Sequence, residues 1–119
     1  MTVVSIKSMA EREGIYSVLE SLGTDTEISI PLYEDFIILP IEELNLNVRS
    51  FNGLKRAKID TIGSLAKTIT SESGLSNIRN LGRKSIREIC EALLNECYAR
   101  LSDAEKDQFI YETLRGSMK

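Results

Sequence analysis

The sequence predicts a mainly α-helical protein, and three observations support this fold class. Apolar residues recur at helical spacing in two segments, around residues 9–22 and 86–97. Two Ser-x-x-Glu segments, at residues 8–11 and 102–105, have the form of a helix N-terminal capping box. The 119 residues are 42% hydrophobic and 28% charged, which suits one small folded domain with appendages. We therefore expect a compact domain of four to five helices with an additional segment at each end.

Residues 1–40 are predicted to be an N-terminal extension. An amphipathic helix is expected over residues 9–22, ending before Gly23, with Gly14 weakening it by about 1 kcal/mol relative to alanine. The apolar face of this helix consists of Ile15, Val18, Leu19 and Leu22. Three runs rich in β-branched or aromatic residues also favour short strands, namely residues 3–6, 27–30 and 35–39.

Residues 41–95 are predicted to form the central domain. Val48, Phe51 and Leu54 form an apolar stripe, which is typical of a short amphipathic helix. A second short helix is expected over residues 61–67, and a turn-rich run follows from residue 68 to 77. The longest predicted helix comes next, and one of its faces carries Ile86, Ile89, Cys90, Leu93, Leu94 and Cys97.

Residues 96–119 are predicted to be a C-terminal helical extension. Phe109, Ile110 and Leu114 give this helix an apolar face, and it is expected to end near Arg115. Two interpretations of the extensions stay open. Both can pack on the central domain and enlarge a small core, or one can dock a second copy of the chain or another protein.

The composition excludes most enzyme classes. Histidine is absent, which removes the commonest general base and the Ser-His and Cys-His nucleophile pairs. Cys90 and Cys97 would lie about 10 Å apart on one helix, too far apart for a disulfide, so we expect buried thiols. We therefore expect a non-catalytic protein with no cofactor and no metal. Neither a membrane span nor a secretory signal is apparent, so a cytoplasmic location is expected.

The charge is unevenly distributed along the sequence. From Arg49 to Arg87 there are nine basic and two acidic residues, a local balance of +7, whereas the remaining residues sum to −10. The formal net charge of −3 conceals this asymmetry. A basic middle favours a polyanionic partner, although a merely solvated basic face is the alternative.

The octet IRNLGRKS, residues 78–85, has the pattern of a helix-hairpin-helix motif. Gly82 allows the backbone to approach a ligand closely, and the helix start beyond it leaves amide groups free for a phosphate. Lys84 adds a point charge and Ser85 a hydroxyl donor, and both suit phosphate oxygens. The alternative is a plain corner between two helices, with Gly82 as a tight turn and Lys84 in water.

Two motifs in order, VRSFNGLKRA and RNLGRKS, strongly resemble the C-terminal domain of the bacterial RNA polymerase alpha subunit. The similarity extends over residues 41–94. It implies an all-α domain that binds the minor groove of A·T-rich DNA and presents surfaces to transcription activators. The DNA contacts that the resemblance implies are Arg49, Asn52, Gly53, Asn80, Gly82, Lys84 and Ser85.

Physical reasoning agrees with the implied role of Arg49. Its guanidinium suits the narrow, strongly negative minor groove of an A-tract. An ion pair with Glu42 or Glu43 is the alternative for this side chain. Two departures from the family are visible: Gly53 stands where many members have cysteine, and Asn45 stands where an acidic residue often contributes to a sigma-factor contact.

The N-terminal extension is too short to be the assembly domain of an alpha subunit, so a free-standing copy of the DNA-reading module is expected. The favoured hypothesis is a DNA-binding transcription accessory with weak, salt-sensitive affinity. The alternative is a protein-interaction module that mimics the alpha domain and titrates transcription regulators without useful DNA binding. RNA polymerase, sigma factor, transcription regulators and a second copy of the chain are the candidate protein partners.

Overall fold

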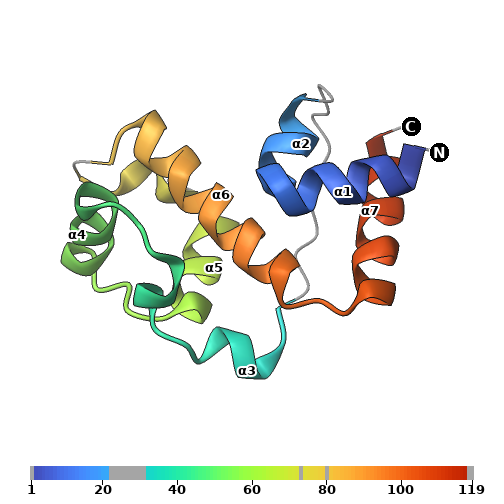
Figure 1. The fold of residues 1–119 in the computed structure, drawn as a ribbon. Helices are drawn as coiled ribbons and strands as arrows, with labels where there is room; N and C mark the ends of the chain where they lie inside the picture. Colours follow the sequence, from blue (N-terminus) through green and yellow to red (C-terminus); the bar gives the residue numbers. More distant parts are fainter. Residues whose placement is uncertain (1, 22–31, 73, 80, 118–119) are drawn as a thin grey trace. The chain divides into compact units, whose positions relative to one another are not determined.

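The computed structural model describes residues 2–21, 32–72, 74–79 and 81–117. These residues form helices and no strand, which confirms the predicted mainly α fold (Figure 1). The elements are α1 (Thr2–Glu13), α2 (Ile15–Ser21), α3 (Glu34–Ile37), η1 (Ile41–Leu44), α4 (Val48–Arg56), α5 (Ile62–Thr70), η2 (Gly74–Asn77), α6 (Arg83–Ala99) and α7 (Asp103–Ser117).

The protein divides into two compact units. We call residues 32–93 the central unit, and residues 1–31 together with 94–119 the terminal unit. Helix α6 contributes its first part to the central unit and its last part to the terminal unit. The domain boundaries expected at residues 40/41 and 95/96 stay a prediction.

The helices of the central unit are short and depend on caps and a shared core. The Asn47 side chain accepts a hydrogen bond from the Ser50 amide at 2.9 Å, and Thr61 caps α5 through the Ser64 amide at 3.1 Å. Each cap satisfies an amide that a helix start leaves without a partner. The most deeply buried apolar side chains of this unit are Ile41, Leu54, Ile62, Leu65, Ile89 and Leu93.

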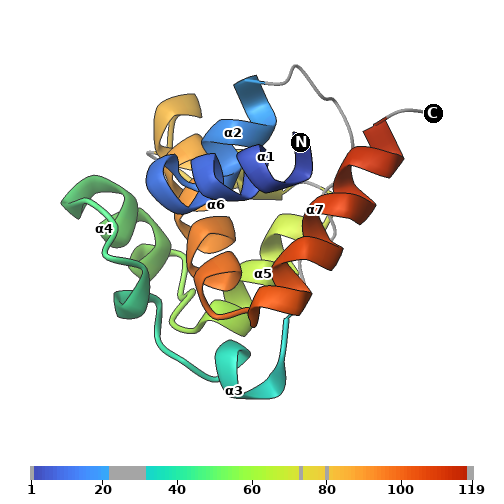
Figure 2. The ribbon, with the colours of Figure 1, turned by 45° about the vertical axis from the view of Figure 1, so that its right-hand side comes forward.

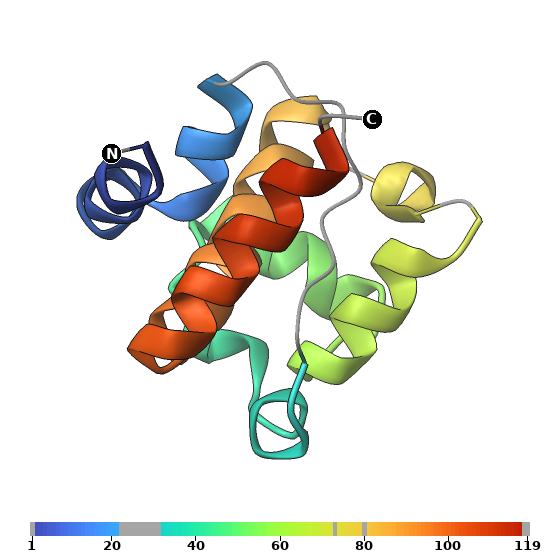
Figure 3. The ribbon, with the colours of Figure 1, turned by 90° about the vertical axis from the view of Figure 1, so that its right-hand side faces the viewer.

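Two segments of the central unit pack on α5. Figure 3 shows α3 below α5 and η2 above it, in agreement with their contacts. Helix α3 lies close to α5 at Gly63: a Cβ on Gly63 would lie 3.0 Å from the Ile37 carbonyl oxygen. Backbone hydrogen bonds from Ile62 to the Leu39 carbonyl at 2.9 Å and from Ile41 to the Asp60 carbonyl at 3.0 Å fix the backbone entering η1.

The terminal unit has a hydrophobic core of its own, to which α1, α2, α7 and the end of α6 contribute. Figure 2 shows α1 and α2 as separate helices that run in different directions. Lys7 of α1 lies 3.7 Å from Asp103 and 3.5 Å from Asp107 of α7, and Lys106 lies 3.7 Å from Glu11. The buried residues of this core are Ala10, Ile15, Val18, Leu19, Leu94, Tyr98, Leu101, Phe109 and Ile110.

The N-terminal predictions were wrong in two respects. The single helix over residues 9–22 is two helices, because Gly14 adopts φ +93 and separates α1 from α2. Residues 3–6, predicted as a strand, lie in α1, so the expected capping residue Ser8 lies inside this helix. The helix is favoured because it places three apolar residues, spaced three and one positions apart, against the core of the terminal unit. These residues are Ile6, Met9 and Ala10.

A second strand prediction, over residues 35–39, was also wrong. Glu34–Ile37 form the short helix α3, which buries Phe36. An isolated strand here would leave its backbone groups without partners, whereas the Phe36 and Ile37 amides both bond the Tyr33 carbonyl, at 2.9 and 3.1 Å. The third strand prediction, over residues 27–30, lies outside the described residues.

The remaining helices lie close to where the sequence predicts them. Helix α5 extends to Thr70, three residues further than expected, and η2 occupies the end of the turn-rich run. The capping box at α7 is confirmed: the Ser102 amide bonds Glu105 at 2.9 Å, and the Glu105 amide bonds the Ser102 hydroxyl at 3.2 Å. None of the helices in the described ranges is long and apolar enough to cross a membrane.

Candidate functional site

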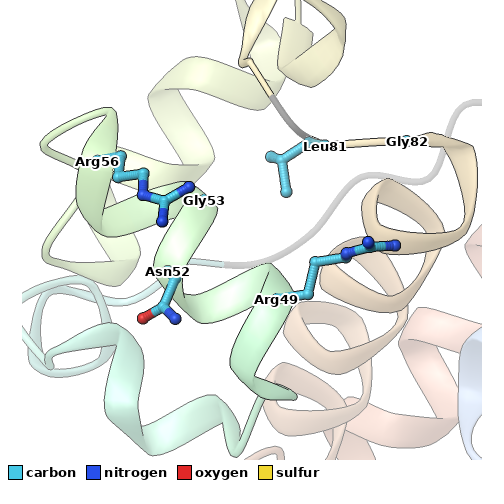
Figure 4. Close-up of a pocket in the computed structure, with 6 residues that line it drawn as sticks. All are labelled: Arg49, Asn52, Gly53, Arg56, Leu81 and Gly82. Carbon is cyan, nitrogen blue, oxygen red and sulfur yellow. The ribbon is translucent and has the colours of Figure 1, made fainter.

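An open pocket of about 740 Å³ lies in the central unit, between α4 and the segment that leads into α6 (Figure 4). Helix α4 contributes residues 49, 52, 53 and 56, which share one face because they are three, one and three positions apart. Figure 4 shows the Leu81 side chain pointing from the opposite side toward α4. The lining residues are Arg49, Asn52, Gly53, Arg56, Leu81 and Gly82.

The start of α4 is held by a carboxylate from α6. Glu88 accepts a hydrogen bond from the Ser50 hydroxyl through one oxygen, and one from the Asn47 amide at 3.3 Å through the other. Ser50 is fully buried. A negative group at a helix N-terminus is also favourable to the helix dipole. Glu88 therefore fixes the turn of α4 from which Arg49 projects.

The approach of Leu81 to α4 depends on glycine. Gly53 is buried, and a Cβ at this position would lie 2.6 Å from Leu81 Cδ2. Helix α4 nevertheless continues through Gly53 to Arg56. The absence of a side chain at Gly53 thus gives Leu81 a place against the helix.

The first turn of helix α6, beside the pocket, has backbone amides that make no hydrogen bond within the helix. Its first intrahelical bond runs from the Ile86 amide to the Gly82 carbonyl at 3.0 Å. The amides of the three preceding residues therefore have no acceptor within the helix. Together with the helix dipole, such amides favour an anion.

Two pocket arginines carry uncompensated charge. Arg49 and Arg56 are exposed, and within the described part of the protein neither forms an ion pair. Lys55, on another side of α4, lies 3.4 Å from Glu42 and 3.1 Å from Asp60. The hydrogen bond to Asp60 is the main cause that raises the Lys55 pKa. Glu42, the partner considered for Arg49, is thus paired with Lys55 instead.

The pocket brings together four of the seven predicted site residues: Arg49, Asn52, Gly53 and Gly82. Lys84 is exposed in the first turn of α6, and Ser85 is only 7% exposed; neither lines the pocket. Asn80 lies outside the described residues. The DNA-contact roles of all seven stay a prediction.

Two pocket residues were not predicted from the sequence. Arg56 lies seven positions after Arg49, a spacing that returns to the same helix face and was available as a signal. Leu81 belongs to the RNLGRKS motif, but no local pattern indicates that it packs against Gly53.

Metal and thiol chemistry find little support in the described ranges. No group of three or more carboxylates or thiols that could hold a metal ion occurs there. Neither Cys90 nor Cys97 takes part in a disulfide. Burial raises the pKa of Cys97 to about 11, so this thiol is protonated at neutral pH.

Fold and site together define a small helical domain with a cationic pocket beside a helix N-terminus. Residues 31–95 match the family of the C-terminal domain of the bacterial RNA polymerase alpha subunit. The protein belongs to this family, which confirms the resemblance noted in the two motifs.

Three relatives, each named DNA-directed RNA polymerase subunit alpha, illustrate the similarity. The protein of Alkaliphilus oremlandii is 39% identical over 94 residues, which cover 76% of this chain and 29% of the relative. The proteins of Corynebacterium diphtheriae and Staphylococcus epidermidis are 41% and 40% identical over 87 and 90 residues, covering 70% and 72% of this chain and 25% and 28% of their own. The aligned region thus spans less than a third of the length of these relatives.

Proposed function

We propose that this protein is a non-catalytic, DNA-binding accessory of bacterial transcription, acting in the cytoplasm, and that its central unit binds the minor groove of A·T-rich DNA. The observation that carries the proposal is the pocket that brings Arg49 together with Gly82, the residue that precedes α6, with no carboxylate paired to Arg49 in the described residues. Membership of the alpha C-terminal domain family supports the same role.

The pocket and the adjoining start of α6 offer two kinds of contact that suit this ligand. A guanidinium fits the minor groove of A·T-rich DNA, because this groove is narrow and its negative potential is enhanced. The amides before Ile86, with the exposed Lys84, suit a backbone phosphate but carry no base information. Arg49 therefore supplies the preference for A·T, and the start of α6 supplies orientation.

Binding by one copy is expected to be weak and salt-sensitive. A few phosphate and groove contacts correspond to a micromolar or weaker affinity, with log K falling by about 0.9 for each counterion released. Useful occupancy then requires a second linked contact, either from a homodimer or from a protein bound alongside.

A second candidate function is the binding of proteins of the transcription machinery. Residues 32–47 contain four carboxylates and no basic residue. In the same segment Tyr33 is 49% and Ile38 73% exposed, an apolar complement to the acidic charge. RNA polymerase, sigma factor or a transcription regulator are the candidate partners; for sigma factor, Glu43 fits the contact but Asn45 replaces an expected acidic residue.

The test of the DNA proposal is fluorescence anisotropy with A·T-rich and G·C-rich duplexes of equal length across a salt series. The wild-type protein is expected to prefer the A·T duplex, and Arg49→Ala to lose that preference. Lys67→Ala is a matched control, because Lys67 is an exposed cation on α5 that does not line the pocket. Absence of binding to both duplexes at low salt would overturn the proposal and leave the protein-binding candidate, which a pull-down with RNA polymerase tests.

A further inference from the structure

Helix α4 carries three cations, and the structure separates them into two kinds. Lys55 is already compensated, since its ammonium lies 3.1 Å from Asp60 and 3.4 Å from Glu42. The same ammonium lies 5.4 Å from the centroid of the Phe51 ring. The two carboxylates offset the positive potential around Lys55, so this cation attracts a polyanion less than an arginine with no carboxylate beside it.

Arg56 differs from Lys55 in each of these respects. Its side chain is exposed and lines the pocket, and no ion pair holds it within the described residues. Figure 4 shows Arg56 and Arg49 projecting from different turns of α4, with the Leu81 side chain opposite. The pocket therefore presents two uncompensated guanidinium groups rather than one.

The spacing of the two arginines limits what Arg56 can contact. Seven residues correspond to two helical turns, so the two Cα atoms lie on one face and about 10 Å apart. The minor groove of B-DNA is only about 6 Å wide. When Arg49 enters the groove, Arg56 consequently lies beyond its edge, where the phosphates are.

The chemistry of an arginine suits that position. Its planar fork can donate two parallel hydrogen bonds to phosphate oxygens. The backbone beside it is held in place, because the Ala57 amide bonds the Gly53 and Leu54 carbonyls at 3.2 and 3.1 Å at the end of α4. The base of the Arg56 side chain is thus fixed while its guanidinium remains free to reach the ligand.

Building on the proposed DNA-binding function, we propose that Arg56 is a second DNA contact, which binds a backbone phosphate at the edge of the groove that Arg49 enters. Arg56 contributes affinity without sequence preference, whereas Arg49 contributes the preference for A·T. The DNA-binding surface therefore extends along the whole of α4 rather than ending at its first turns.

The experiment compares Arg56→Ala, Arg56→Lys and the control Lys67→Ala in the 119-residue protein, with the same two duplexes, from about 50 to about 300 mM salt. Arg56→Ala is expected to reduce the magnitude of the slope of log K against log salt by about 0.9. It is also expected to weaken binding to both duplexes equally, roughly tenfold at the lowest salt. Arg56→Lys is expected to keep the wild-type slope, because a point charge still releases the counterion. Lys67→Ala is expected to change neither slope nor affinity. Thermal melting of each variant verifies that it folds.

The possible results separate this inference from the proposed function. An unchanged salt slope in Arg56→Ala, with wild-type binding intact, would overturn the role of Arg56 and leave the proposed function standing. A loss confined to the A·T duplex would also overturn it, because Arg56 would then read the groove. If the wild-type protein binds neither duplex, the proposed function itself fails, and this inference fails with it.

Discussion

Gly53 and Leu81 are in closer contact than any other residue at position 53 would allow. A Cβ on Gly53 would lie 2.6 Å from Leu81 Cδ2, well inside the usual separation of about 3.5 to 4.0 Å between carbon atoms. Leu81 is only 8% exposed, so its side chain has little room to rotate away. The contact holds Leu81 against α4. It thereby also positions Gly82, which directly precedes α6 and lines the pocket together with Arg49.

This contact predicts that the effect of Gly53→Ala on stability changes sign with the residue at position 81. In the wild-type protein, overpacking against Leu81 outweighs the helix propensity gained, and the free energy of unfolding is expected to fall by about 1 kcal/mol. In a Leu81→Ala background the obstacle is gone, and the same substitution is expected to raise the free energy of unfolding by about 0.5 to 1 kcal/mol. Urea unfolding of the four proteins measures both values. Equal effects in the two backgrounds would show that Leu81 does not limit position 53.

The bond between Ser50 and Glu88 predicts energetic coupling between α4 and α6. Ser50→Ala and Glu88→Ala are each expected to lower the free energy of unfolding by about 1 to 2 kcal/mol, because each removes the Ser50–Glu88 bond, and Glu88→Ala also removes the bond from the Asn47 backbone amide. The double variant is expected to lose less than the sum, since the second substitution removes a bond already broken. Urea denaturation measures this coupling. Strict additivity would contradict it and would mean that the Ser50–Glu88 bond does not hold the start of α4.

The environment of Tyr98 predicts that removing its hydroxyl does not lower the free energy of unfolding. Its hydroxyl is buried and has no hydrogen-bond partner within the described residues, which is an unfavourable state for a polar group. Tyr98→Phe is therefore expected to be at least as stable as the wild-type protein, with a gain of up to about 1 kcal/mol. Tyr111→Phe is the matched control on α7, because Tyr111 is 55% exposed and its hydroxyl can be hydrated. A Tyr98→Phe variant that unfolds more easily than the control would indicate a partner for the hydroxyl.

The raised pKa values of Tyr98 and Cys97 predict a loss of stability at alkaline pH. Burial raises the pKa of Cys97 from 9.0 to about 11 and is the main cause that raises the pKa of Tyr98 from 10.0 to about 12. Between the ordinary and the raised pKa the unfolded protein releases protons that the folded protein retains, so the free energy of unfolding falls as the pH rises. The urea midpoint is expected to be constant below about pH 8 and to fall above about pH 9. Tyr98→Phe is expected to reduce the fall above about pH 10, and an identical profile in that variant would exclude Tyr98 as a contributor.

The sequence predicted what depends on local signals and missed what depends on distant contacts. The apolar spacing over residues 86–97 and the Ser102–Glu105 capping box are readable within one segment, and both were confirmed. The bond from Ser50 to Glu88 spans 38 positions, and the contact of Gly53 with Leu81 joins two separate elements. The spacing of apolar residues within one segment therefore predicts neither contact. The start of the chain was misjudged because β-branched residues favour strands only where a neighbouring strand can pair with them.

Gly14 gives the sharpest test of the difference between the sequence-based expectation and the structure. In a continuous helix over residues 9–22, Gly14→Ala would raise the free energy of unfolding by about 1 kcal/mol. In the structure φ is +93, and a Cβ would lie 2.6 Å from the Asn95 side-chain oxygen, so the same substitution is expected to lower it by about 2 kcal/mol. Gly74→Ala is the matched control, because Gly74 has φ +58 and its nearest neighbouring atom would be 3.9 Å away; a cost of about 1 kcal/mol is expected there. Urea denaturation measures all three proteins, and a stabilised Gly14→Ala variant would mean that one helix continues through residue 14.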